Sequence, residues 1–390
     1  MRICLFTPSF FPVIGGVEYF TDMLARGMIA RGHEVVVIAQ IMKSSTPLWP
    51  LPYPVRQYRR PPMQHLWAEI LARPLVRAWR QYHFDIVLTN YGYPLGYAVS
   101  RVKQRLNVGL ISIAHGSDLH SSFNPKNKLR ANRLRQLGYE RSDQVVGVSR
   151  TMAERVREVI GEAPTPIEVV HNGIDLENWR REQEAARTGT AEVAREFQLA
   201  PGGFTLQVGA LRTVKRPDVA IRAVAKARDS YDRLNLTHVM VGEGKLGADY
   251  RTLAGELGIS DRIVFAGNRT GTDKAWLFAH ARFLVHTSDD EGGLPLVLSE
   301  AAASGLPLLV SDIPSHQDFV ADSGCGRLFR KGDPDDLARG MRAMLEGDLG
   351  RMRAASLERS KNFSWNTTLD AYERLCKKVI GLVQPGKQAR

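Results

Sequence analysis

Apolar and polar positions along the first half of the chain alternate between short buried runs and longer amphipathic segments. Residues 2–7 form an apolar run, and a loop rich in glycine and proline spans residues 8–16. Helical periodicity follows over residues 17–31 and stops at Gly32. Further strand-like runs, separated by helix-length segments, lie at residues 33–39, 84–89, 109–114, 144–148 and 167–171. This order predicts a parallel sheet joined by crossover helices.

A second series of the same kind occupies the C-terminal half. Residues 180–200 are polar and contain no apolar run, so they mark the junction between two domains. The strand-like runs beyond this junction lie at residues 204–208, 236–241, 262–265, 282–286 and 306–310. The pattern predicts an α/β protein with two tandem doubly wound sheets, and a length of 390 residues suits two domains.

The composition is that of an ordinary globular enzyme. Hydrophobic residues make up 44% of the chain and charged residues 24%, which excludes disordered, collagen-like and disulfide-rich classes. The cysteines, Cys4, Cys325 and Cys376, are far apart and lack metal-ligand spacing, which favours reduced buried thiols. We find no signal-peptide pattern and no apolar run of about 18 residues, so we expect neither secretion nor a membrane span.

The net charge of +12 is concentrated in the first half of the chain. Between residues 56 and 80 one acidic residue faces six arginines, which are Arg56, Arg59, Arg60, Arg73, Arg77 and Arg80. Residues 126–141 are also basic. Two interpretations stay open, a solvated basic face or contact with anionic lipid head groups. Binding to nucleic acid is disfavoured because no helix-turn-helix, zinc-finger or RNP-like pattern is present.

The candidate site residues of the first domain follow its strands, because ligands of open parallel sheets bind at the carboxyl ends of the strands. Gly15 and Gly16 lie between the first strand and the first helix, where backbone N–H groups can approach an anion or a sugar oxygen. A bare turn is the other interpretation, and the absence of G-x-G-x-x-G lowers the case for an oxidoreductase. His115 ends a buried strand with Asp118 close by, which favours a chemical role over a structural one.

The candidate residues of the second domain lie in two loops. Arg212 and Lys215 precede a helix whose N-terminal dipole disfavours cations, so their position suggests a diphosphate clamp. Glu300 follows an acidic, glycine-rich loop and suits hydrogen bonding to the vicinal hydroxyls of a ribose. A divalent-metal site formed by Asp289, Asp290 and Glu291 is a weaker alternative, because consecutive residues point in different directions.

The loops that carry these candidate residues, taken in chain order, resemble the successive motifs of the large retaining family of GT-B glycosyltransferases, called family 4 or group 1. Asn172-Gly173-Ile174-Asp175 at the junction and Phe363-Ser364-Trp365 before the last helix are similar to family motifs as well. The resemblance implies two Rossmann-like domains facing a central cleft. The domains expected are an acceptor-binding domain at 1–185, a nucleotide-sugar-binding domain at 186–362, and a C-terminal helix at 363–390 that returns to the first domain.

The resemblance also assigns roles to single residues. Its implied catalytic residues are His115, Arg212, Lys215 and Glu291. Its implied donor-binding residues are Gly15, Gly16, Gly242, Gly292, Gly293, Leu294 and Glu300. Lys215 and Arg212 would neutralise the donor diphosphate, and His115 would lie near the reacting sugar. Family members usually need no metal or other cofactor and retain the anomeric configuration through an oxocarbenium-like transition state.

The sequence departs from the family pattern at two positions. Eight residues separate Glu291 from Glu300 where the family has seven, so Gly292 occupies the position of the first glutamate. Either a one-residue bulge lets Glu291 reach the sugar, or main-chain groups bind it. Ala210 stands where the family has an arginine, and Arg212 follows two residues later, from where we expect it to compensate.

The expected activity is the transfer of a sugar from a UDP- or GDP-linked donor to a glycan or a lipid-linked acceptor. The basic first domain suggests a cytoplasmic enzyme that lies peripherally on the inner face of the cell membrane and makes envelope polysaccharide or glycolipid. One alternative is a non-hydrolysing sugar-nucleotide epimerase. Another is a non-catalytic subunit that binds a sugar nucleotide or a membrane.

Overall fold

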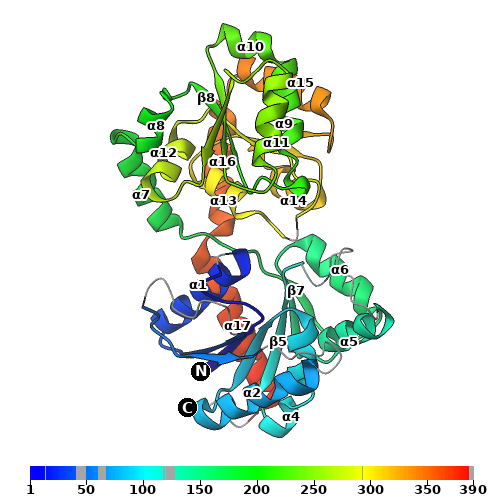
Figure 1. The fold of residues 1–390 in the computed structure, drawn as a ribbon. Coiled ribbons are helices and arrows are strands. Elements are labelled where there is room, and N and C mark those ends of the chain that lie inside the picture. Colours follow the sequence, from blue (N-terminus) through cyan, green and yellow to red (C-terminus); the bar gives the residue numbers. More distant parts are fainter. Residues whose placement is uncertain are drawn as a thin grey trace. The chain divides into compact units, whose positions relative to one another are not determined.

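The computed structural model describes residues 1–13, 15–40, 50–59, 67–116, 119, 128–291 and 293–385. The chain forms two compact units, of which the first contains Met1–Asn172 and Thr368–Arg390 and the second contains Gly173–Thr367. Each unit has a parallel sheet with helices packed around it (Figure 1). The predicted α/β class with two doubly wound sheets is therefore confirmed.

The sheet of the first unit has seven strands in the order β3-β2-β1-β4-β5-β6-β7. These strands are β1 (Arg2–Thr7), β2 (Glu34–Gln40), β3 (Val55–Tyr58), β4 (Ile86–Asn90), β5 (Gly109–Ala114), β6 (Gln144–Gly147) and β7 (Ile167–Val169). The α-helices are α1 (Gly16–Ala30), α2 (Trp67–Tyr82), α3 (Tyr97–Ser100), α4 (Lys103–Leu106), α5 (Lys128–Glu140) and α6 (Arg150–Ile160), and a π-helical turn spans Gly92–Gly96. The central strands are buried along nearly their whole length, because helices cover both faces of the sheet.

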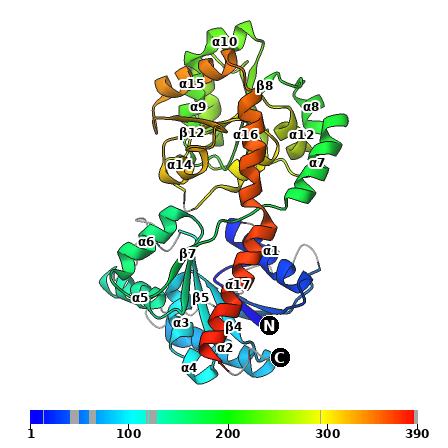
Figure 2. The same cartoon turned by 180° about the vertical axis from the view of Figure 1, so that it is seen from behind.

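The C-terminal helix α17 (Trp365–Val383) packs on the first unit from Thr368 onward, as Figure 2 shows. The Leu369 side chain lies against Gly27, where a Cβ atom would approach its methyl groups to 2.5 Å. Arg31, which follows α1, also donates a hydrogen bond of 2.9 Å to Glu373. The first unit is therefore built from both ends of the chain.

The sheet of the second unit has six strands in the order β10-β9-β8-β11-β12-β13, which repeats the winding of the first sheet. These strands are β8 (Phe204–Val208), β9 (Thr237–Val241), β10 (Ile263–Gly267), β11 (Leu284–His286), β12 (Leu308–Ser311) and β13 (Gly326–Phe329). The α-helices are α7 (Leu176–Thr188), α8 (Glu192–Glu196), α9 (Pro217–Lys226), α10 (Arg228–Arg233), α11 (Gly247–Glu256), α12 (Gly271–His280), α13 (Leu296–Ala303), α14 (Pro314–Val320), α15 (Pro334–Glu346) and α16 (Gly350–Ser360). Short 3-10 turns span Thr213–Lys215 and Lys361–Phe363.

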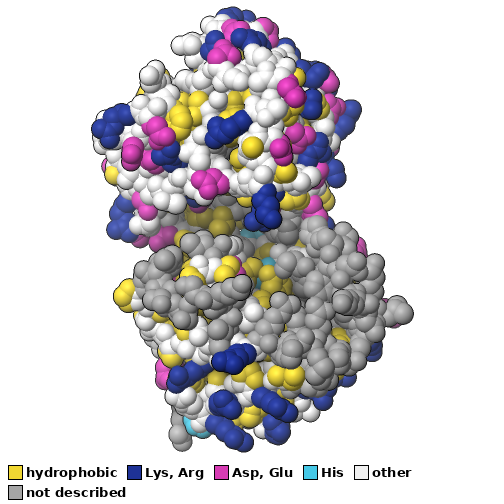
Figure 3. Space-filling view, in the orientation of Figure 1, with side chains coloured by type: hydrophobic (Ala, Val, Ile, Leu, Met, Phe, Trp, Pro, Cys, Tyr) yellow, Lys and Arg dark blue, Asp and Glu magenta, His cyan; other side chains and the backbone are white. Residues whose placement is uncertain are grey.

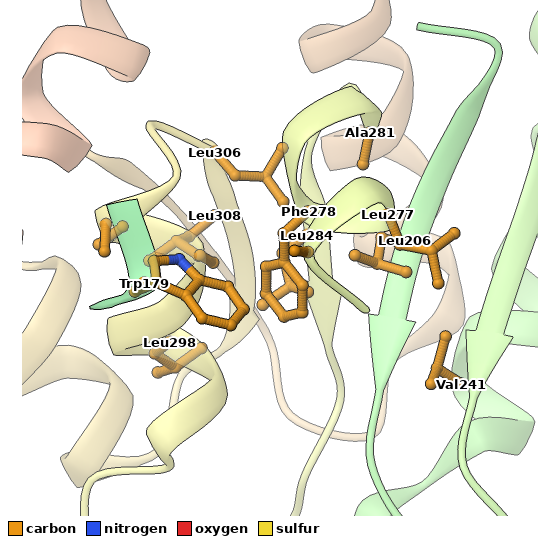
Figure 4. Close-up of a cluster of buried hydrophobic side chains, with 14 of the residues drawn as sticks. Trp179, Leu206, Val241, Leu277, Phe278, Ala281, Leu284, Leu298, Leu306 and Leu308 are labelled. Atoms are coloured by element: carbon orange, nitrogen blue, oxygen red, sulfur yellow. The ribbon is translucent and has the colours of Figure 1, made fainter. Parts of the chain in front are cut away.

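The division between the units falls after Asn172, thirteen residues before the predicted end of the first domain at residue 185. The reason is the buried indole of Trp179, which ties α7 to the core of the second unit (Figure 4). Trp179 donates a hydrogen bond of 2.9 Å to Ser304, and its ring meets that of Phe278 edge-on at 5.4 Å between centroids. The polar composition of residues 180–200 had suggested a linker, but α7 buries Gln183 and Ala186 as well as Trp179 and is anchored by them.

Helix α2 presents a basic face to solvent. Arg73, Arg77 and Arg80 are exposed on it, and Figure 3 shows Lys and Arg side chains gathered over α2 and α4. Arg56 of β3 joins this face, where it donates a hydrogen bond of 3.0 Å to Gln81. Among the described residues, no helix is both long and apolar enough to cross a bilayer.

Candidate active site

Two loops meet at the centre of the second sheet. The strand order reverses between β8 and β11, which are neighbours in the sheet. Open parallel sheets bind ligands outside the carboxyl ends of their strands, at the point where the order reverses. The β8 loop (residues 209–216) carries Lys215, and the β11 loop (residues 287–291) carries Glu291. The topology therefore brings these two predicted site residues to one edge of the sheet.

Lys215 and Glu291 form a short ion pair. The Lys215 Nζ lies 2.5 Å from the Glu291 Oε1, which also accepts a hydrogen bond of 2.6 Å from Ser288 and lies 2.9 Å from the His286 Nε2. Burial alone would raise the pKa of Glu291, but the His286 hydrogen bond and the Lys215 charge outweigh it and hold this pKa well below its usual range. Glu291 is therefore ionised at neutral pH and holds the Lys215 ammonium group in one place.

The main chains of the two loops are also joined. The Thr287 hydroxyl donates a hydrogen bond of 2.7 Å to the carbonyl of Lys215, and the Asp289 N–H donates one of 2.9 Å to the carbonyl of Val214. Arg216 forms an ion pair of 3.1 Å with Asp289. Lys215 is thus held at its backbone and at its side chain, and both contacts come from the β11 loop.

The residues that follow Glu291 lie in different environments. Gly292 lies outside the described residues, so the part of the predicted sugar-binding backbone that depends on it is not seen. Gly293 is half-buried, and Leu294 places its side chain in the hydrophobic core of the second unit. The extra residue between the two glutamates does not prevent Glu291 from reaching Lys215.

Arg212, the predicted partner of Lys215, lies three residues before it in the β8 loop. Its side chain is exposed and forms no hydrogen bond or ion pair with the residues that the structure describes. Its backbone is extended, and its N–H donates a hydrogen bond of 2.8 Å to the carbonyl of Ala210. An unengaged guanidinium at this place is available to an anion at the end of β8.

Glu300 belongs to a second ion pair in the same unit. Its Oε1 lies 2.6 Å from the Nζ of Lys274 on α12, and this lysine also lies 5.6 Å above the ring of Trp179. Burial raises the pKa of Glu300, and the Lys274 charge acts against that shift. Glu300 thus forms its ion pair with Lys274, and its described contacts include neither Lys215 nor Glu291.

Glycines shape a pocket of about 540 Å³ beyond the ends of β8, β9 and β10. Its lining residues are Leu211, Gly242, Glu243, Gly244, Gly247, Arg251 and Gly267. Gly242 has φ of +134°, and a Cβ atom there would lie 2.1 Å from the carbonyl oxygen of Gly209. Only glycine fits this position, because the end of β9 packs directly on the β8 loop. The predicted donor-binding residue Gly242 therefore lines a cavity in the unit that holds Lys215.

In the first unit, His115 follows β5 and contacts the end of β4. The Asn90 Nδ2 donates a hydrogen bond of 2.8 Å to Thr21, which leaves the Asn90 Oδ1 to accept one of 2.8 Å from the His115 Nε2. Burial lowers the pKa of His115 to about 3, so its imidazole is neutral at physiological pH. The proton therefore resides on Nε2, and Nδ1 is an acceptor. Asp118, expected near His115, lies outside the described residues.

Gly15 and Gly16 lie at the start of α1, and the space beside each of them differs. A Cβ atom at Gly15 would lie 2.5 Å from the Glu18 Oε2, whereas one at Gly16 would meet nothing within 4 Å. Glu18 is buried and accepts a hydrogen bond from Ser9. The close approach at Gly15 is therefore made by a carboxylate of the chain itself, and only Gly16 faces open space.

One set of described residues has the composition of a metal site. Single ligand atoms of His286, Glu291 and His316 lie within 4.8 Å of one another. However, the Glu291 Oε1 already accepts from the ammonium of Lys215 at 2.5 Å, so a metal ion would have to displace that cation. Asp289 contacts Arg216 instead of this cluster. The donors present therefore fit a lysine better than a metal ion.

Four further residues of this site were not predicted from the sequence: His286, Ser288 and His316 lie around Glu291, and Thr287 contacts Lys215. The signal existed for His286, because this histidine ends a buried strand in the way that made His115 a candidate. The position of His286 at the end of a buried strand could therefore have identified it as a candidate site residue. His316 lies on α14, far along the chain, and carries no comparable signal.

The comparisons with known proteins agree with this fold. Residues 14–178 match the family described as Glycosyltransferase Family 4, and residues 195–363 match Glycosyl transferases group 1. The D-inositol 3-phosphate glycosyltransferase of Mycobacterium marinum is 28% identical over 325 residues, which are 79% of this chain and 66% of that protein. The enzyme of the same name from Salinispora tropica is 30% identical over 312 residues, which are 74% of this chain and 64% of that protein. The match thus spans slightly less than two thirds of the length of these relatives.

Solved structures show the same architecture. The Anabaena protein HepE, crystallised in complex with UDP, superimposes with a TM-score of 0.77 at 18% identity, over 97% of this chain and 100% of that one. Its complex with UDP-glucose superimposes with a TM-score of 0.75 at 17% identity, over 96% and 99% of the two chains. With both halves matched in order, the chain belongs to the GT-B glycosyltransferases of family 4, group 1.

Proposed function

We propose that this protein transfers a sugar from a nucleoside diphosphate sugar to an acceptor. The observation that carries the proposal is the Lys215 ammonium group, which a buried carboxylate holds at the switch point of the second sheet. An ammonium has three N–H donors, and the ion pair uses one, so the others are available to phosphate oxygens. Arg212 supplies a second cation from the same loop, which suits the charge that develops on a leaving diphosphate.

The nucleoside is proposed to bind in the glycine-lined pocket, whose lining includes Leu211 of the β8 loop that also carries Lys215. Gly242 and its neighbours let a planar base or a ribose approach the backbone closely. Glu300 is proposed to bind the ribose hydroxyls through the carboxylate oxygen that does not contact Lys274. UDP and GDP are the proposed nucleotides, and the HepE complexes with UDP and UDP-glucose support UDP first.

The chemistry proposed is retention of the anomeric configuration without a metal ion. Its support is the family resemblance and the cationic pair of Arg212 and Lys215, which can stabilise the leaving diphosphate where a metal would otherwise act. His115, neutral and with its Nδ1 as an acceptor, is proposed to contact a hydroxyl of the transferred sugar. Gly16 is proposed to contact the donor through its backbone.

The acceptor is proposed to be a glycan or a lipid-linked molecule, in envelope polysaccharide or glycolipid synthesis. We also propose that the enzyme is cytoplasmic and lies peripherally on the inner face of the membrane. The support is the basic face of α2, where Arg73, Arg77 and Arg80 are exposed together. Basic side chains near an anionic leaflet each contribute about 1 kcal/mol of binding free energy.

Calorimetric titration with UDP, GDP and ADP tests the donor site. We expect one nucleotide to bind and the affinity to fall in Lys215→Ala and Glu300→Ala. Lys226→Ala is the matched control, because this exposed lysine of α9 forms its ion pair with Asp335 at the surface. Hydrolysis of the corresponding sugar nucleotide, followed by NMR of the first anomer released, then tests turnover and retention. No binding of any of the three nucleotides would contradict the proposal and favour the non-catalytic subunit.

A further inference from the structure

The last residue of β11 and the two that follow it form a polar segment at the base of the candidate site. We name His286, Thr287 and Ser288 the β11 triplet. Their side chains are almost completely buried, with relative exposures of 2%, 0% and 0%. Burial of three consecutive polar residues is costly unless each is hydrogen-bonded. All three are hydrogen-bonded, and each is linked to Lys215, either through Glu291 or directly at the Lys215 carbonyl.

One arm of the contacts runs through Glu291. The Ser288 hydroxyl donates to the Glu291 Oε1 at 2.6 Å, and the His286 Nε2 lies 2.9 Å from the same oxygen. Because an ionised carboxylate only accepts, His286 must carry its proton on Nε2 and donate it. These two hydrogen bonds hold the Glu291 carboxylate in the orientation in which its Oε1 lies 2.5 Å from the Lys215 Nζ.

The other arm runs through Thr287 to the backbone of Lys215. The Thr287 hydroxyl donates to the Lys215 carbonyl at 2.7 Å and accepts from the Gln207 Nε2 at 2.9 Å. The Gln207 Oε1 lies 3.3 Å from the Nε2 of His238, whose Nδ1 lies 2.8 Å from the Thr205 hydroxyl. Each group in this series donates one hydrogen bond and accepts the next. The series of buried hydrogen bonds therefore runs across β9 and β8 and ends at Lys215.

We propose that the β11 triplet is a positioning device for Lys215, in which His286 and Ser288 act through Glu291 and Thr287 acts on the backbone. The inference rests on the proposed donor site. A lysine side chain has many rotamers, and a site that has already ordered it loses less conformational entropy on binding an anion. The triplet therefore raises the affinity for a diphosphate without touching it.

Conservative and disruptive variants at the same positions test this role. Gln at position 286 can place an N–H where the imidazole Nε2 donates, whereas Leu cannot. We expect His286→Leu to weaken the binding of UDP, or of inorganic pyrophosphate, about tenfold or more, and His286→Gln to restore most of it. Thr287→Val should weaken binding about three- to tenfold, and Thr287→Ser should restore it. Calorimetric titration measures each affinity, and thermal unfolding shows whether each variant is folded.

A double-mutant cycle separates positioning from a general loss of packing. If His286 acts through Glu291, His286→Leu should add little to the loss already caused by Glu291→Gln. Losses that multiply would overturn the inference, as would equal affinities of His286→Leu and the wild type. His280→Gln is the control, because this half-buried histidine of α12 contacts the carbonyl of its own helix. Wild-type affinity in Lys215→Ala would instead contradict the proposed donor site, so the two failures are distinguishable.

Discussion

Acidification should destabilise this protein through its buried histidines, and His238 allows the effect to be measured. His238 is completely buried between Thr205 and Gln207, and burial lowers its pKa to about 3 from an ordinary value near 6.5. The unfolded chain therefore takes up a proton at a higher pH than the folded chain does. The contribution to stability is complete above pH 6.5 and is lost as the pH falls toward 3.

The magnitude follows from the size of the shift. Each pH unit between the two pKa values changes the free energy of unfolding by about 1.4 kcal/mol for one group. At pH 5, which is one and a half units below the pKa of the unfolded chain, His238 should lower the free energy of unfolding by about 2 kcal/mol relative to pH 7. Glu300, whose pKa is raised by burial, changes stability in the opposite direction, but it does so equally in wild type and variant.

Urea unfolding at pH 7 and pH 5, followed by tryptophan fluorescence, measures this difference. The loss between the two pH values should be about 2 kcal/mol smaller in His238→Gln than in the wild type. Thr205→Val is the control, because it removes a hydrogen bond of the same histidine without removing a titrating group. It should lower stability similarly at both pH values. An equal pH dependence in His238→Gln and the wild type would refute the reasoning.

Three further perturbations follow from the fold. Gly242→Ala would force a Cβ atom to within 2.1 Å of a backbone carbonyl at a positive φ, so it should destabilise the second unit by about 2 kcal/mol or more and abolish nucleotide binding, as thermal unfolding and calorimetry would show. Leu284→Ala should cost about 2–5 kcal/mol in urea unfolding, because this core side chain is fully buried (Figure 4), and a loss below 1 kcal/mol would mean that the core collapses around the gap. Glu at positions 73, 77 and 80 in place of arginine should abolish co-sedimentation with vesicles rich in anionic lipid, and retained binding would argue against the basic face as a membrane contact.

The sequence pattern predicted the central strands of both sheets and missed one edge strand of each. β1 and β8 are buried along nearly their whole length because helices cover both faces of each sheet, and most of their residues are apolar. β3 and β13 are edge strands, each with an arginine and further exposed positions, so neither forms an apolar run. The opposite edge strands, β7 and β10, do contain apolar runs and were predicted at residues 167–171 and 262–265, so the pattern fails only where an edge strand lacks such a run.

The candidate site could be located from the sequence, but its contacts could not. The carboxyl ends of strands identified the loops of Lys215 and Glu291, because topology alone brings those loops together. The partners of each side chain depend on residues far apart in the chain, such as Lys274 beside Glu300. Likewise, the close approach at Gly15 belongs to Glu18, which only the folded helix terminus reveals.

The chain passes between its two units twice, once after Asn172 and once after Thr367, and this has a consequence for truncation. The second unit is one continuous stretch, so a fragment of residues 173–367 contains every element of its sheet. The first unit has no such fragment, because Tyr372 and Leu369 of α17 fill its interior. A stop codon introduced near residue 365 would therefore damage the amino-terminal half of the protein and leave the half next to the truncation intact.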